Sequence, residues 1–197
     1  RYCFRPRMTK QLWILAGGNG TGKSTFYRIN LLPRGLPMLN VDDIAKKLEP
    51  DDPGPAIATA QKWVEVKRTI LVESGGSFCY ETVFSHASKV DFVAEAKSHG
   101  YEITIIYIHL GSPNLNQARV NQRVSEGGHD VPRDKIKARI PRAMGYVSDA
   151  LVLADQIRLL DNSSHAKPFQ QIASVDRGHI TAHVEPLPDW ARTMLNQ

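Results

Sequence analysis

The chain has 197 residues, of which 42% are hydrophobic and 23% are charged, and its formal net charge is +5. This composition is ordinary for a globular protein and excludes disordered and collagen-like classes. No apolar run approaches the ~18 residues of a membrane span, so no membrane association is expected. The positive charge favours a polyanionic ligand, and nucleic acid and nucleotide phosphates fit this requirement equally well.

The cysteine content and the chain length limit the cellular location and the number of domains that we expect. Only Cys3 and Cys79 occur, far apart in the sequence, which favours a reducing, cytoplasmic location over a disulfide framework. No signal peptide is visible, because the first apolar segment is short enough to be a strand. We expect one domain over residues 8–197, with a natural start at Met8 and residues 1–7 as an extension or a remnant of cloning.

Short apolar runs alternate with segments of helical periodicity along most of the chain. This alternation predicts an α/β fold with a central, mainly parallel sheet of about five strands and helices on both faces. A terminal hairpin and a short last helix should follow. The predicted strands are 11–16, 36–41, 77–84, 102–110 and 156–163; the helices are 23–32, 42–50, 56–74, 90–98, 113–126 and 136–154; the hairpin is 169–185 and the last helix 188–197.

The segment GGNGTGKST, between the first strand and the first helix, satisfies the pattern G-x-x-x-x-G-K-[ST]. Glycines let several backbone N–H groups point at one phosphate chain, and the helix adds the positive end of its dipole. Lys23 should reach the β- and γ-phosphates, and the Ser24 hydroxyl can ligate Mg²⁺. We therefore predict a P-loop nucleotide site that contains Gly17, Gly18, Asn19, Gly20, Thr21, Gly22, Lys23, Ser24 and Thr25.

Carboxylates follow two further predicted strands, where the carboxyl ends of parallel strands face a ligand crevice. Asp42 and Asp43 could position an acceptor hydroxyl and take its proton, or they could simply cap and charge the next helix. Glu81, with Thr82 beside it, could orient substrate or a metal-bound water, or form a structural salt bridge. The chemistry of these acids remains open on the residues alone.

The segment from Arg119 to Arg142 holds seven Lys or Arg residues and three acids, with Gly127-Gly128 near its centre. Phosphoryl transfer needs cations around the equatorial phosphate oxygens and exclusion of water. We interpret residues 113–142 as a lid that carries Arg123, Arg139 and Arg142 to the triphosphate. The alternatives are a solvated basic face or a nucleic-acid groove, and the lack of aromatic residues in 111–142 disfavours the groove.

These motifs together resemble the zeta toxin-like P-loop kinases, in particular their small stand-alone bacterial branch. The resemblance runs from about Gln11 to Ser164. It rests on LAGGNGTGKST, NVDDIA, ETVFSH, ARVNQRVSEGGHDVP with its trailing IKARIPRA, and ADQIRLLDNSS, in the family's order. It implies a P-loop kinase fold and transfer of phosphate from ATP or GTP, with Mg²⁺, to a 3′ sugar hydroxyl of UDP-N-acetylglucosamine. It also implies that a separate antitoxin chain could block the nucleotide site.

The resemblance assigns roles residue by residue. Lys23 and Ser24 match the phosphate-loop lysine and the metal-binding hydroxyl, and Asp42 matches the catalytic aspartate in the N-x-D-x-I-A pattern. Glu81 matches the acid that holds the substrate sugar, and Arg123 matches a lid arginine on the γ-phosphate. Asp43 falls at a variable position. Two departures are a valine at position 83, where the family commonly has threonine, and a second lid cation that could be His129, Arg139 or Arg142.

We therefore expect a cytoplasmic small-molecule kinase whose acceptor is a sugar nucleotide, with Asp42 as base and Asp43, Glu81, Thr82 and His129 near the acceptor. A nicotinamide dinucleotide or another nucleotide-like acceptor is the alternative within enzymes. A non-catalytic nucleotide switch or a nucleic-acid-associated ATPase is the alternative outside them, although nucleic acid is not the expected partner.

Overall fold

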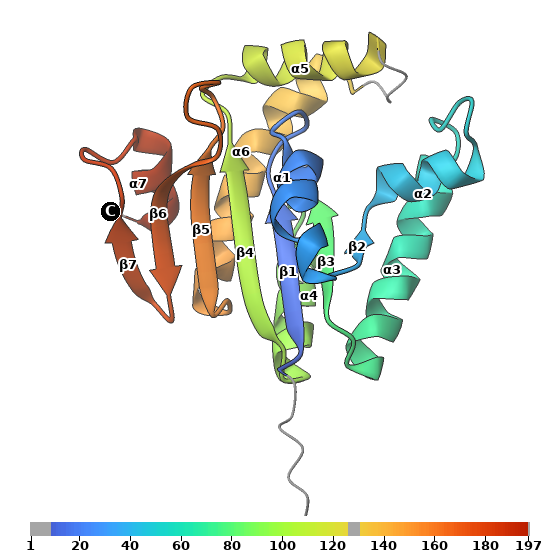
Figure 1. The fold of residues 1–197 in the computed structure, drawn as a ribbon, viewed down its shortest axis with the longest axis horizontal. Helices are drawn as coiled ribbons and strands as arrows, with labels where there is room; N and C mark the ends of the chain where they lie inside the picture. Colours follow the sequence, from blue (N-terminus) through green and yellow to red (C-terminus); the bar gives the residue numbers. More distant parts are fainter. Residues whose placement is uncertain (1–8, 126–130, 197) are drawn as a thin grey trace, which may run out of the picture.

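The computed structural model describes residues 9–125 and 131–196 as one seven-stranded sheet with helices on both faces (Figure 1). The strand order is β2-β3-β1-β4-β5-β6-β7. The first five strands in this order run parallel, and β6 and β7 extend the sheet antiparallel. The strands are β1 (Gln11–Ala16), β2 (Met38–Leu39), β3 (Phe78–Thr82), β4 (Glu102–His109), β5 (Gln156–Asp161), β6 (Gln170–Asp176) and β7 (His179–Ala182).

The helices cover the sheet unevenly. In Figure 1, α1 and the short η1 lie in front of the sheet, α4 and α6 lie behind it, and α5 crosses above the carboxyl ends of the strands. Within the described residues no helix is long and apolar enough to cross a membrane. The helices are α1 (Lys23–Asn30), η1 (Leu32–Arg34), α2 (Val41–Leu48), α3 (Ile57–Ser74), α4 (Ser88–Ser98), α5 (Pro113–Ser125), α6 (Arg133–Asp149), η2 (Ala150–Val152) and α7 (Asp189–Leu195).

Two apolar layers hold the central strands, because successive side chains of a strand point to opposite faces. Leu12 and Ile14 of β1 pack in the larger layer with α3, α4, α6 and α7, whereas Leu15 packs in the smaller layer with Tyr27 and Leu31. β4 contributes to both layers in the same way, and all but the first of its residues are buried. Burial on both faces explains why these strands read as continuous apolar runs.

The fold class and the five parallel strands are confirmed, while several details differ. The sheet has seven strands, because the predicted C-terminal hairpin pairs with β5 through β6 and becomes part of the sheet. The strand predicted over 36–41 is only Met38–Leu39, and the helix after it begins at Val41. The helix predicted over 23–32 ends at Asn30, and a short 3₁₀ turn carries Pro33. The helix predicted over 136–154 is Arg133–Asp149 followed by η2.

The sheet brings five strand ends to a single edge. The phosphate loop follows β1, α2 follows β2, Glu81 lies near the end of β3, and Asn162 follows β5. Ligands of open α/β sheets bind at this edge, outside the carboxyl ends of the strands. The fold therefore places the predicted site residues close together although they are distant in sequence.

Two glycines should respond oppositely to alanine. Gly145, inside α6, is exposed, and a Cβ there meets nothing within 4 Å. Gly145→Ala should stabilise the protein by about 1 kcal/mol through helix propensity. Gly17 has φ of 141°, and a Cβ there would collide with the carbonyl oxygen of Ile108. Gly17→Ala should therefore cost about 2 kcal/mol or more.

Thermal unfolding measures both changes, and 1 kcal/mol corresponds to a shift in Tm of about 2–4 °C for a chain of this size. Equal shifts for the two variants would contradict the conformations described for these two glycines.

Candidate active site

A large cleft of about 1230 Å³ opens at the carboxyl edge of the sheet. Its wall on one side comes from the phosphate loop and the segment after β5, including Asn162, His165 and Phe169. On the other side the wall comes from α2, α3, the end of β3 and the start of α4. Residues of α5 and α6 also line the cleft, so one cavity connects the donor and acceptor positions expected from the sequence. In Figure 1, α5 crosses above this edge of the sheet.

The phosphate loop is held in a conformation that requires glycine. Gly17, Gly20 and Gly22 have φ of 141°, 78° and 95°, which favour glycine. Gly22 precedes the first turn of α1, so the N-terminus of α1 faces the cleft beside the loop. Lys23 lies inside the loop and is 7% exposed, and its Nζ donates to the carbonyl oxygens of Gly17 (3.0 Å) and Gly18 (2.9 Å).

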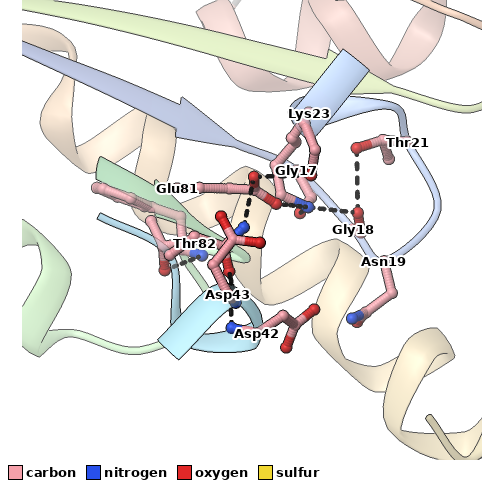
Figure 2. A network of polar contacts seen from close by, with 12 residues as sticks. Gly17, Gly18, Asn19, Thr21, Lys23, Asp42, Asp43, Glu81 and Thr82 are labelled. Atoms are coloured by element: carbon pink, nitrogen blue, oxygen red, sulfur yellow. Dashed lines mark hydrogen bonds and ion pairs between the residues drawn. The ribbon is translucent and has the colours of Figure 1, made fainter. Parts of the chain in front are cut away.

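Glu81, near the end of β3, contacts both the start of α1, which follows the phosphate loop, and the N-cap of α2. Its Oε2 accepts a hydrogen bond from Ser24 Oγ (3.0 Å) and another from Asn40 Nδ2 (2.8 Å). Its Oε1 lies 3.9 Å from Lys23 Nζ. Figure 2 shows Glu81 between the phosphate loop and the first turn of α2. The structure therefore contains the salt bridge that was the alternative interpretation of Glu81, and its partner is the phosphate-loop lysine, Lys23.

The surroundings of Glu81 perturb its ionisation. Burial raises the pKa of Glu81 above its ordinary value, although the charge of Lys23 and the hydrogen bond from Ser24 act in the opposite direction. The negative charges of Asp42 and Asp43 add to the upward shift of this pKa. Carboxyl groups in a cleft whose pKa is shifted by burial and by charged neighbours are typical of functional sites.

The oxygen atoms beside the loop suit Mg²⁺. The Ser24 hydroxyl and the Glu81 carboxylate are hard ligands that lie within hydrogen-bond distance of each other. No group of three or more His, Cys, Asp or Glu side chains in the described part of the chain could hold a metal by itself. Mg²⁺ usually binds through one or two protein oxygens together with water and substrate phosphates, and Ser24 and Glu81 could supply the protein oxygens.

Asp42 and Asp43 differ in their relation to the cleft. Asn40 is the N-cap of α2, because its Oδ1 accepts from the backbone N–H of Asp42 (2.7 Å) and of Asp43 (3.4 Å). The alternative that Asp42 caps the next helix is therefore wrong, because Asn40 is the cap and both acids lie in the first turn. Asp42 lines the cleft, whereas Asp43 is exposed and lies outside the lining. Partial removal of its carboxyl group from water, and then the neighbouring charge of Asp42, raise the pKa of Asp43.

The predicted lid residues are only partly described. Arg139 and Arg142 both line the cleft from α6, as their spacing on one helix face predicts, and Arg142 Nε donates to Ala138 O (3.0 Å). Arg123 lies near the C-terminal end of α5, but its side chain is outside the described residues. His129 and the Gly127-Gly128 pair also fall outside them.

The remaining predicted site residues divide into loop supports and cleft walls. Thr21 is buried and its Oγ1 donates to Gly18 O (3.0 Å), so its side chain stabilises the loop itself. Thr82 lines the cleft, and its Oγ1 accepts from Phe84 N (3.1 Å). Val83, where the family commonly has threonine, also lines the cleft. Asn19, Gly20, Gly22, Ser24 and Thr25 line the cleft as well.

Asn162 is a buried residue of the site that sequence reasoning missed. Its Nδ2 donates to Thr21 O in the phosphate loop (2.9 Å), and its Oδ1 accepts from Phe169 N (3.2 Å). Its backbone N–H donates to His109 O (3.0 Å), and its carbonyl accepts from Arg119 Nη2 (2.9 Å). It therefore ties four segments together at the cleft. The sequence signal that could have identified it is the position of a polar residue, Asn162, directly after the apolar strand β5.

Arg119 and Asn116 were also missed as site residues. Both are on α5, and Asn116 Nδ2 donates to Asn19 O in the phosphate loop (2.7 Å). Arg119 lines the cleft and contacts Asn162, as described above. These two contacts fix the described part of α5 directly over the loop.

A glycine-rich loop between a central parallel strand and a helix, with a buried lysine and facing carboxylates, defines a P-loop protein with a kinase-type fold. Consistent with this class, the family model AAA_33, described as an AAA domain, matches residues 12–143. The chain belongs to this family.

Known proteins extend the comparison. An uncharacterised protein of Haemophilus influenzae is 29% identical over 138 residues, which cover 66% of this chain and 97% of that protein. A chain of the AvrRxo1-ORF1:ORF2 crystal structure with ATP is similar with a TM-score of 0.71 and 17% identity over 90% of this chain. A chain of the PezAT toxin–antitoxin system of Streptococcus pneumoniae has a TM-score of 0.67, 15% identity, and coverage of 95% and 84%.

These structural similarities establish the fold shared with the zeta toxin-like P-loop proteins that the motifs resemble. The chain spans 61% of the AvrRxo1 chain that it matches, so that protein contains further sequence with no counterpart in the alignment.

The ionisation of Glu81 should be visible in the pH dependence of stability. Because the pKa of Glu81 is raised in the folded state, the unfolded chain loses this proton first as pH rises above about 4.5. Stability should therefore decrease across the interval between the ordinary and the raised pKa, and Glu81→Gln should remove this decrease. The measurement is the Tm of both proteins from pH 4 to 8. A difference in Tm that stays constant with pH would show that burial does not perturb this carboxyl.

Proposed function

We propose that the protein is a kinase that transfers the γ-phosphoryl group of ATP or GTP to a hydroxyl of a small molecule. The supporting observation is the network in which Glu81 contacts Ser24, Lys23 and Asn40. This network connects the phosphate loop to the helix turn that carries Asp42, within one cleft. Acids on the cleft wall opposite the phosphate loop are placed where they can orient and deprotonate an acceptor hydroxyl.

On the donor side, the chain's own groups bind and orient the triphosphate. Backbone N–H groups of residues 17–24 and the N-terminus of α1 surround the phosphates, and Lys23 neutralises charge on the β- and γ-phosphates. Mg²⁺, held by Ser24 together with phosphate oxygens, would supply further neutralisation of the charge that develops in transfer. Arg119 and the segment 162–169 line the cleft beside the phosphate loop, where they can contact the base and sugar of the nucleotide.

On the acceptor side, Asp42 is the proposed base. The acceptor hydroxyl forms a new bond to the γ-phosphorus, the bond from that phosphorus to the β,γ-bridging oxygen breaks, and the hydroxyl proton passes to the Asp42 carboxylate. Glu81 and Thr82 orient the acceptor, and Arg139, Arg142 and Arg123 stabilise charge on the transferring group. Asp43, which lies outside the cleft lining, is a secondary candidate that adds negative charge nearby.

The acceptor that fits best is bulky. A cleft of about 1230 Å³ exceeds the ~300–1,000 Å³ of most single-ligand sites, so it can hold a triphosphate and a second sizeable molecule. A UDP-activated amino sugar such as UDP-N-acetylglucosamine is the leading acceptor on the motif resemblance. Val83 in the cleft is a departure that would alter contacts to that sugar. A separate antitoxin protein is a proposed partner, in view of the similarity to a chain of a toxin–antitoxin system.

The direct test is incubation of the protein with γ-labelled ATP, Mg²⁺ and a metabolite extract, followed by mass spectrometry of labelled products. UDP-N-acetylglucosamine and a nicotinamide dinucleotide are tested separately as pure acceptors. Lys23→Ala is the matched control that lacks the phosphate-loop cation. Labelled product from the unaltered protein alone supports a kinase, whereas release of free phosphate alone supports an ATPase or switch.

Asp42→Asn should lower phosphoryl transfer by about two to four orders of magnitude, the usual range for loss of a general base, with unchanged affinity for the non-hydrolysable analogue AMP-PNP. Asp43→Asn is the matched control on the same helix turn and should have a small effect. Rates come from labelled product, and affinities come from calorimetry. A larger loss in the Asp43 variant would exchange the roles of the two acids.

Arg123→Ala should reduce kcat by about 10³-fold or more and change AMP-PNP affinity little, because an arginine on the transferring phosphoryl group acts mainly in the transition state. Arg142→Ala should show a weaker form of the same effect. Steady-state kinetics measure both. If Arg123→Ala alters only thermal stability, the basic solvated surface is the correct interpretation of this segment.

A further inference from the structure

Asn40 is a buried residue whose side-chain amide contacts two parts of the site at once. Its Oδ1 accepts from the backbone N–H of Asp42 (2.7 Å), and its Nδ2 donates to Glu81 Oε2 (2.8 Å). These contacts define the orientation of the amide, because only its oxygen can accept from a backbone N–H and only its nitrogen can donate to a carboxylate. The amide therefore cannot be turned around without the loss of both hydrogen bonds.

The sheet does not extend to the turn that Asn40 begins. β2 pairs with β3 only at Met38 and Leu39, so the backbone ladder stops one residue before Asn40. α2 starts directly after it, at Val41. Beyond the end of the ladder, the Asn40 side chain supplies a hydrogen-bonded link between β3 and the first turn of α2.

This link continues to the phosphate loop. Glu81 Oε2 also accepts from Ser24 Oγ (3.0 Å), in the first turn of α1. A chain of hydrogen bonds thus runs from Ser24 through Glu81 and Asn40 to the backbone of Asp42, which lines the cleft. Displacement of a reacting group by about 1 Å can cost about 10²-fold in rate, so the length of this chain bears on catalysis as well as on helix capping.

We propose that Asn40 is the positioning residue of Asp42 and that, acting through Glu81, it sets the place of the proposed base relative to the phosphate loop. Capping alone needs only an oxygen at position 40, which serine and aspartate supply as well as asparagine does. The nitrogen of the amide serves the contact with Glu81. The role of Asp42 as base rests on the proposed kinase activity, whereas the link from Glu81 to α2 does not.

The kinetic test uses Asn40→Ser, which keeps an oxygen for the cap and removes the donor to Glu81. The rate of labelled product from γ-labelled ATP, Mg²⁺ and metabolite extract should fall by about 10²-fold. AMP-PNP affinity, measured by calorimetry, should stay the same. Asn30→Ser is the matched control, because Asn30 lies outside the cleft lining and donates to Phe26 O (3.1 Å); it should leave both quantities unchanged.

A double substitution tests whether Asn40 acts through Glu81. Glu81→Ala removes the oxygen to which Asn40 donates, so the two substitutions break the same contact. In the Glu81→Ala protein, Asn40→Ser should therefore cause a further loss of less than about threefold, because substitutions that remove one shared contact are not additive. A full further loss of about 10²-fold would show that Asn40 acts independently of Glu81.

A test without turnover uses Asn40→Asp, which keeps a capping oxygen and places a carboxylate against Glu81. Two carboxyl groups in contact share a proton, so the pKa of the pair rises above that of the unfolded chain. The stability that this proton provides is present at low pH and is lost as pH rises through the raised pKa. The Tm of Asn40→Asp, relative to that of Asn40→Ser, should therefore decrease from pH 4 to pH 8.

The other groups that act on the pKa of Glu81 are common to both variants. Lys23 and Ser24 of α1 lower this pKa, and Asp42 and Asp43 of α2 raise it. Their effects therefore largely cancel in the comparison of the two Tm values.

The positioning role is wrong if Asn40→Ser transfers phosphate at the unaltered rate, or if the difference in Tm between Asn40→Asp and Asn40→Ser is constant with pH. If Asn40→Asp does not fold at pH 4, the double substitution decides. An unaltered protein that transfers no phosphoryl group would refute the proposed kinase activity, and the pH comparison would then decide alone whether Asn40 joins Glu81 to α2.

Discussion

The contact between Glu81 and its three partners is the constraint on which the site depends. A carboxylate this deeply placed is stable only if hydrogen-bond donors and a positive charge surround it, and Ser24, Asn40 and Lys23 supply them. The partners come from two segments: Lys23 and Ser24 begin α1, and Asn40 caps α2. The same contact therefore fixes the distance between the phosphate loop and the acids opposite it.

Asn162 has a comparable role on the other side of the loop. The hydrogen bonds of Glu81 connect the loop to β3 and α2. Those of Asn162 connect the loop to β4, α5 and the segment after β5. Partly buried Glu81 and buried Asn162 thus hold the loop from both sides, in addition to the contacts of its own backbone. Such second contacts keep reactive groups within the small tolerances that catalysis requires.

The sequence predicted the central parallel sheet and the phosphate loop because their signals are local. Continuous apolar runs mark strands that are buried on both faces. The pattern G-x-x-x-x-G-K-[ST] is by itself typical of a phosphate-binding loop. Asn40 shows where local signals fail: its side chain reaches forward to two backbone N–H groups, which shortens β2 and starts α2 at Val41. The roles of Arg119 and Asn162 depend on contacts between residues 43 and 141 positions apart, and no local pattern encodes such pairs.

The shortness of β2 has a consequence for how this scaffold can diversify. β1 and β4 pair over six residues each, whereas β2 pairs with β3 at only Met38 and Leu39. The α2–α3 unit that forms the proposed acceptor wall is therefore attached to the sheet by little backbone pairing, and mainly by side-chain packing. Substitutions in that wall can change its position without disturbing the strands that carry the phosphate loop. The α2–α3 side of the cleft can therefore change shape while the phosphate loop keeps its geometry.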